Sequence, residues 1–196
     1  MKIRSLLSAA VIALLVPTLV ACGGSKDKDA DAKPTKSSSS SPSKSADPTS
    51  GLVPLTADGF SMKLPHEAKS SPQTFDTPAG KVNTTVYSDV NDDGGFVVAM
   101  SAYPNGAKVD LDGAVKGVAG NFSGTVAVNR TIEVNGYPAR QVRIDNATTS
   151  GTAITIYLLA VDVNDKLFQL QYIIKGEAPE TAPAVLDTVA STITFS

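Results

Sequence analysis

The clearest ligand-like pattern in the sequence is the acidic segment Asp89-Val90-Asn91-Asp92-Asp93-Gly94. Oxygen-bearing side chains at its first, third and fifth positions, Asp89, Asn91 and Asp93, match the opening of a calcium-binding EF-hand loop, which also has glycine sixth. That loop needs a bidentate glutamate at its twelfth position, and Met100 stands there. The flanking residues alternate like strands rather than helices, so we expect a polar hairpin turn and no metal site.

The sequence contains few of the residues that a hydrolytic enzyme needs. Its only histidine, His66, follows Pro65 and precedes Glu67. A catalytic triad needs a histidine beside a nucleophile and an orienting acid, and no G-x-S-x-G elbow marks such a nucleophile. The single cysteine also excludes an intrachain disulfide and a cysteine-rich zinc site. We therefore expect a solvated loop histidine, no catalysis and no cofactor.

The cysteine itself closes the motif Leu19-Val20-Ala21-Cys22. The motif follows a basic start and an apolar stretch, 6–16, that is typical of an export signal and too short to span a membrane. It matches the bacterial lipobox, in which the cysteine thiol receives a diacylglyceryl group and the signal peptide, here 1–21, is removed. Two acyl chains suffice for stable anchoring. We expect a protein anchored through Cys22 to the extracytoplasmic face of the cell membrane.

Residues 22–50 comprise the lipidated cysteine and a tether rich in serine, lysine, aspartate and proline. Such a composition cannot bury enough apolar surface to offset the entropy cost of ordering, so the tether is expected to be disordered. Its root-mean-square span is about 30 Å. The remaining residues, 51–196, are expected to form one domain with ten basic and fifteen acidic residues. This acidic balance argues against a nucleic-acid partner.

Hydrophobic periodicity predicts an α+β domain, a mostly antiparallel sheet with helices packed on it. Helical spacing predicts one helix over 110–122, with Asp110 as its N-cap, and another over 183–190. The dipeptide Asn135-Gly136 predicts a tight hairpin. The predicted strands cover 60–64, 82–86, 96–103, 126–134, 137–145, 154–163, 167–174 and 192–195, and those at 96–103 and 154–163 are apolar on both faces, as interior strands are.

Four polar residues on two predicted strands form a candidate docking patch for an envelope partner. Gln141 and Arg143 share one face of their strand, and Gln169 and Gln171 share one face of theirs. If the two faces coincide, the sheet carries a solvated polar patch. An ordinary solvent-exposed face explains the same residues.

The order of elements resembles that of the PsbP-like superfamily. The resemblance is carried by the opening Gly59-Phe-Ser-Met-Lys-Leu-Pro, the hairpin Asn135-Gly-Tyr-Pro-Ala, the hairpin joining 154–163 to 167–174, and the closing helix and strand. With the lipobox and the tether, the chain looks most like LpqN-type bacterial envelope lipoproteins. The resemblance implies an α/β/α sandwich that works by binding and has no catalytic residues.

Two functions remain open from the sequence. The first is a binding or adaptor module for an envelope partner, and the second is a carrier of an apolar envelope lipid or other hydrophobic ligand between sheet and helices. A carrier needs a cavity of about 300 Å³ or more beneath the 110–122 helix. Small residues there, such as Ala114 and Ala119, favour close packing and therefore the adaptor.

Overall fold

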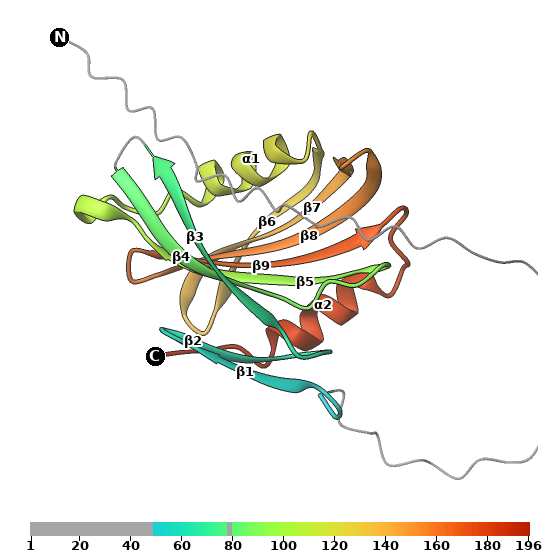
Figure 1. The fold of residues 1–196 in the computed structure, drawn as a ribbon, viewed down its shortest axis with the longest axis horizontal. Helices are drawn as coiled ribbons and strands as arrows, with labels where there is room; N and C mark the ends of the chain where they lie inside the picture. Colours follow the sequence, from blue (N-terminus) through green and yellow to red (C-terminus); the bar gives the residue numbers. More distant parts are fainter. Residues whose placement is uncertain (1–48, 78–79) are drawn as a thin grey trace, which may run out of the picture.

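The computed structural model describes residues 49–77 and 80–196, so the predicted signal peptide, Cys22 and nearly all of the tether lie outside the described residues. Three layers are visible in Figure 1: a seven-stranded sheet in the middle, α1 on one face, and α2 with a three-stranded sheet on the other. The strands are β1 (Val53–Ala57), β2 (Phe60–Leu64), β3 (Lys69–Thr77), β4 (Gly80–Ser88), β5 (Gly94–Ala102), β6 (Thr125–Val134), β7 (Tyr137–Thr149), β8 (Thr152–Val163), β9 (Lys166–Lys175) and β10 (Thr194–Phe195). The helices are η1 (Pro104–Gly106), α1 (Leu111–Asn121) and α2 (Ala182–Ala190).

All neighbouring strands are antiparallel, which confirms the expected α+β class. The large sheet has the order β3-β4-β5-β9-β8-β7-β6, and the small sheet has the order β1-β2-β10. The interior positions expected for 96–103 and 154–163 are also confirmed, because β5 and β8 each lie between two strands.

Two tight turns explain why the long hairpins close where they do. Asn135 and Gly136, between β6 and β7, have φ of 52° and 81°. Asn164 and Asp165, between β8 and β9, have φ of 53° and 65°. Two successive residues with positive φ make a turn whose twist matches that of the strands it joins, and Asn, Asp and Gly reach that conformation at low cost. The hairpin predicted at Asn135-Gly136 is confirmed.

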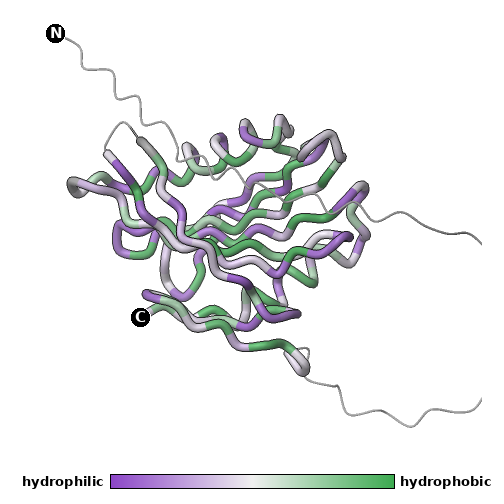
Figure 2. The backbone as a smooth tube through the Cα atoms, in the orientation of Figure 1, coloured by the Kyte–Doolittle hydropathy of each residue, from purple (hydrophilic) through white to green (hydrophobic). Residues whose placement is uncertain are grey.

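The large sheet separates two hydrophobic cores. Along β8, Ile156 and Leu158 point toward α1, whereas Tyr157 and Leu159 point toward α2 and β2. This alternation makes β8 apolar on both faces. In Figure 2 the strands in the middle of the sheet carry green segments with purple ones between them. Apolar burial on both sides of one sheet fixes the positions of both helices.

Close packing holds α1 on the sheet. The Asp110 side chain accepts a hydrogen bond of 2.9 Å from the Gly113 amide, which confirms the predicted N-cap. Ala114 and Ala119 are buried at 3 % and 7 % exposure. After the helix, the Thr148 amide of β7 donates to the Phe122 carbonyl at 2.7 Å. Small side chains thus let the helix approach the sheet closely.

Two strands of the structure, β1 and β3, were not predicted from the sequence, and a third strand is shorter than expected. The edge strand β3 includes Pro72 and is mostly polar, so it lacks the alternation that marks a half-buried strand. The strand β1 includes Pro54 and alternates only weakly. The closing strand, expected over 192–195, is only β10, because Thr192 and Ile193 still bond back to the last turn of α2.

Candidate functional site

The acidic segment predicted as a turn joins β4 to β5. Asn91 and Gly94 form an isolated bridge, and the Asn91 side chain accepts a hydrogen bond of 2.9 Å from the Asp93 amide. Gly94 and Gly95 let the turn lie against the sheet: a Cβ on Gly94 would stand 2.0 Å from the Ile173 carbonyl oxygen of β9. The expectation of a hairpin turn is confirmed.

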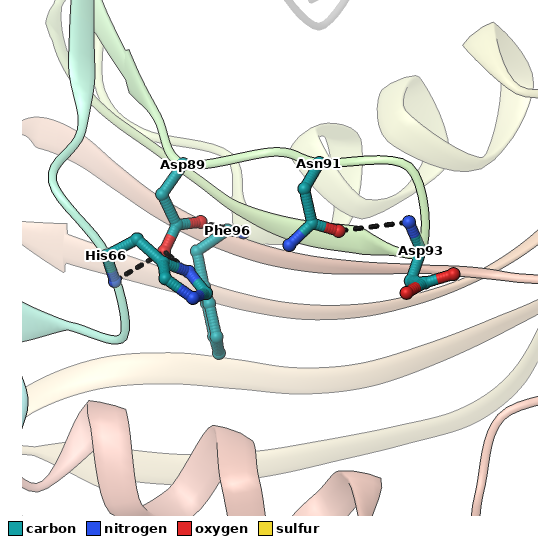
Figure 3. A network of polar contacts seen from close by, with 5 residues as sticks. All are labelled: His66, Asp89, Asn91, Asp93 and Phe96. Atoms are coloured by element: carbon teal, nitrogen blue, oxygen red, sulfur yellow. Dashed lines mark hydrogen bonds and ion pairs between the residues drawn. The ribbon is translucent and has the colours of Figure 1, made fainter.

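Asp89 acts as the internal anchor of this turn (Figure 3). Its carboxylate is 1 % exposed and accepts hydrogen bonds from the Phe96 amide and, at 3.3 Å, from the His66 amide. His66 Nδ1 lies 3.7 Å from Asp89 Oδ2, while the imidazole remains 66 % exposed. The carboxylate therefore connects the β2–β3 loop to β5 through backbone donors.

The side-chain oxygens of Asp89 and Asn91 accept hydrogen bonds inside this turn. The oxygens of Asp89 bond to two backbone amides, and the Asn91 carbonyl oxygen bonds to another. Within residues 49–77 and 80–196, no three His, Cys, Asp or Glu side chains are grouped so that they could hold a metal ion.

A hollow of about 300 Å³ lies beside the turn, bounded by His66, Tyr172 and Val185 of α2. Burial raises the pKa of the Tyr172 phenol, and the nearby Asp89 and Tyr157 raise it further. The ring stacks on Phe96, with centroids 4.5 Å apart. The raised pKa favours the neutral phenol, and the stacked ring forms part of the wall of the hollow.

Gln141 and Arg143, the first half of the predicted docking patch, lie together in a groove between β6, β7 and α2. Gln141 Nε2 donates to Asp187 Oδ1 of α2 at 2.9 Å, and Arg143 Nε donates to Asp145 Oδ1 at 2.7 Å. The pair with Asp145 raises the pKa of Arg143 above its ordinary value, so the guanidinium is always charged. The groove has a volume of about 200 Å³, and Val128, Arg130, Tyr157, Pro183 and Leu186 also line it.

Gln169 and Gln171 lie on the opposite face, so the prediction of one shared polar patch is wrong. Residues opposed in antiparallel strands share a face, and Gln141 opposes Leu159, which opposes Leu170. The glutamines flank Leu170 and therefore point to the α1 side, where they are buried at 4 % and 1 % exposure. The Oε1 atom of Gln171 has no hydrogen-bonding partner among the described residues.

The sequence analysis missed Val128, Arg130 and Asp187, which complete the groove. Arg130 opposes Gln141 and Val128 opposes Arg143 in the β6–β7 hairpin, so all four point to the α2 face. Extending the alternation outward from the Asn135-Gly136 turn would have found Arg130. Asp187 could not be found in this way, because α2 reaches the groove only through tertiary packing.

A further hollow of about 430 Å³ lies between the β1–β2 turn and the β3–β5 part of the sheet. Met100, Tyr87 and Phe60 form its apolar floor, and Asp58, Gln73, Asn83 and Lys166 are among the polar residues around it. No helix among the described residues is long and apolar enough to cross a bilayer.

No family model matches the chain, and no curated protein is a match. A crystal structure at 1.50 Å resolution from Bacteroides thetaiotaomicron VPI-5482 is similar, with a TM-score of 0.39 and 12 % sequence identity. The match covers 70 % of this chain and 45 % of that one, so the chain spans less than half the length of its structural neighbour. At this TM-score the likeness supports no argument about fold or function.

Proposed function

We propose that the chain is an exported, lipid-anchored envelope protein whose domain is a non-catalytic binding or adaptor module. The observation that carries the anchoring is the motif Leu19-Val20-Ala21-Cys22, which ends an export signal with the only cysteine of the chain. A tether of about 30 Å then holds the domain beside the membrane surface but clear of the lipid headgroups.

For the domain we propose the PsbP-like α/β/α sandwich of LpqN-type lipoproteins. The order of the elements supports this proposal: an opening hairpin whose second strand begins at Phe60, three further strands, a helix, two long hairpins, a closing helix and a last strand. One departure from the simplest sandwich is that β1, β2 and β10 share a layer with α2.

Close packing beneath α1 supports the adaptor over the carrier. Ala114 and Ala119 of α1 are buried in one cluster with Ile144 and Ala147 of β7. Gly124, just after α1, lies so near the sheet that a Cβ there would stand 2.5 Å from Ile144 Cγ2 and 3.0 Å from Ala147 Cβ. A carrier with its ligand beneath this helix needs an apolar cavity there instead. Arg130, Arg143 and Asp187 border the groove between β6, β7 and α2, which suits contact with a protein surface.

Fractionation of cells that produce Cys22→Ala tests the anchoring. We expect this variant to leave the membrane fraction or to keep its signal peptide, while Ser25→Ala, three residues away, behaves as the wild type. A Cys22→Ala chain that stays membrane-bound at wild-type size would refute the lipid anchor.

Native mass spectrometry of the protein purified from its own host separates adaptor from carrier. A ligand-free mass is expected for the adaptor. Lipid that co-purifies at near-stoichiometric level would favour the carrier.

A further inference from the structure

The two edges of the large sheet are built differently. Proteins protect exposed edge strands with proline, lysine, bulges or short length, because the unpaired N–H and C=O groups otherwise accept another strand. The edge strand β3 follows this rule, since it includes Lys69 and Pro72. The opposite edge strand, β6, has ten residues and neither lysine nor proline, and its bulge lies near its start, between Val126 and Val128.

The strand β6 also exposes apolar side chains to solvent. Its first seven residues are all exposed. Four large hydrophobic residues are exposed among those described, and two of them, Val126 and Val128, lie on β6 at 37 % and 38 % exposure. The bulge between them is the only irregularity of the hairpin register, and it leaves Val128–Val134 as a regular strand.

Basic side chains lie near this edge of the sheet. The three arginines of the domain, Arg130, Arg140 and Arg143, all lie on the β6–β7 hairpin. Arg140 is paired with Asp112, and Arg143 is paired with Asp145. Arg130 has neither an ion pair nor a hydrogen-bonded side-chain partner within the described part of the chain, and it borders the groove beside Val128.

We propose that β6 accepts an extended polypeptide strand that carries a carboxylate side chain two residues from an apolar one. A strand added along β6 turns alternate side chains toward the α2 face, where Val128 and Arg130 lie. An apolar residue then packs beside Val128, and a carboxylate pairs with Arg130. This inference rests on the proposed binding function and names its surface and the chemistry of its partner.

A second copy of the chain fits this edge less well. Two β6 strands related by a two-fold axis keep the same face on the same side, so Arg130 of both copies would lie on one face of the joined sheet. The resulting repulsion favours a different strand with acidic side chains.

Binding of labelled peptides to the mature full-length protein in detergent tests the proposal. The probe is a ten-residue peptide of alternating valine and threonine in which one central valine is replaced by glutamate. Its controls are the same peptide with lysine at that position and a glutamate peptide that is N-methylated at every second residue, which removes the donors along one edge. We expect the glutamate peptide to bind about fivefold more tightly than the lysine peptide, and N-methylation to abolish binding.

Substitutions in the protein test whether the peptide binds at β6. Val128→Lys introduces the protection that natural edges use and is expected to abolish binding, whereas Val90→Lys, at an equally exposed valine of the β4–β5 turn, is expected to leave it unchanged. Arg130→Glu is expected to reverse the preference between the glutamate and lysine peptides. Unfolding midpoints equal to the wild type show that the exposed substitutions leave the fold intact.

Three results would overturn the inference. They are no binding of the glutamate peptide, equal effects of Val128→Lys and Val90→Lys, or a dimer in solution that Val128→Lys dissociates. None of these results touches the lipid anchor, which the Cys22→Ala fractionation tests separately.

Discussion

Arg140 and Gln141, consecutive residues of β7, hold the two helices from opposite faces of the sheet. Arg140 Nε donates to Asp112 Oδ1 in the first turn of α1 at 2.8 Å, and Gln141 Nε2 donates to Asp187 Oδ1 of α2 at 2.9 Å. Successive side chains of a strand point to opposite faces, so one dipeptide reaches both outer layers. The wall of the groove and the packing of α1 therefore depend on the same strand.

The ion pair with Arg140 makes α1 docking sensitive to acid. The hydrogen bond from Arg140 lowers the pKa of Asp112 below its ordinary value of 3.8, with Lys116 contributing. Because the folded-state pKa is the lower one, the stabilisation is present at neutral pH and is lost as the pH falls through the acidic range. The effect is small because the pair is exposed to solvent.

Thermal unfolding of Asp112→Asn measures this contribution. We expect the variant to unfold at a slightly lower temperature than the wild type at pH 7, and this difference to shrink as the pH is lowered below 3.8. Asp92→Asn, in the exposed β4–β5 turn, serves as the control. A difference between wild type and Asp112→Asn that stays constant as the pH is lowered would contradict the proposed electrostatic origin.

The buried amide of Gln171 predicts a stabilising substitution. Its Oε1 atom is buried with no hydrogen-bonding partner in residues 49–77 and 80–196, and burial of an unsatisfied polar atom costs about 1–3 kcal/mol. Gln171→Leu, of similar volume, is expected to raise the free energy of unfolding by about 1 kcal/mol in a urea titration. Gln141→Leu is the matched control and should give no gain, since it removes the bond to Asp187. A loss of stability in Gln171→Leu would mean that the amide has a role in the fold.

The two glutamine-containing strands show where sequence reasoning stops. Period-two alternation correctly places Gln169 with Gln171, and Gln141 with Arg143, because that relation lies within one strand. Whether the polar residues of two strands lie on the same face of the sheet depends on the register in which the strands pair. A shift of one residue in that register moves every side chain of a strand to the other face. The register of β8 against β9, with Leu159 opposite Leu170, sends the two pairs to opposite faces.

The elements predicted correctly are those with strong local signals. The Asn135-Gly136 turn, the Asp110 cap and the doubly apolar β8 each follow from local chemistry. The strand β3 was not predicted because it lies at the edge of the sheet and much of it is exposed to solvent. Its sequence therefore shows no alternation of apolar and polar residues. The groove beside α2 was found only in part, because Asp187 reaches it through packing between layers.

Removal of the Asp89 carboxylate is expected to weaken the fold. Asp89→Ala leaves the Phe96 and His66 amides without their acceptor, and the resulting loss is about 2–4 kcal/mol in the free energy of unfolding. Asp89→Asn retains one acceptor oxygen and should lose less. Asp93→Ala, in the exposed part of the same turn, is the control and should change stability little.

The same proteins distinguish this anchoring role from metal binding. If Asp89, Asn91 and Asp93 bound calcium, millimolar calcium would raise the unfolding temperature of the wild type but not that of Asp93→Ala. We expect the same unfolding temperature with and without calcium for both proteins.

Two glycines at the end of α1 test how closely the helix packs on the sheet. A Cβ on Gly120 meets nothing within 4 Å, so Gly120→Ala is expected to stabilise the protein by about 0.5–1 kcal/mol through helix propensity. A Cβ on Gly124 stands 2.5 Å from Ile144 Cγ2, inside the core, so Gly124→Ala is expected to cost about 1–3 kcal/mol. Urea titrations of the two variants should therefore shift in opposite directions.

The sign of the Gly124→Ala effect also bears on function. A carrier with a hollow beneath α1 would accommodate the extra methyl group and lose no stability, because an empty apolar space gains contacts when it is filled. An adaptor at native packing density must displace Ile144 or Ala147, and buried side chains at that density resist displacement. Loss of stability in Gly124→Ala, with a gain in Gly120→Ala, is the result that the adaptor predicts, whereas a gain in both would favour the carrier.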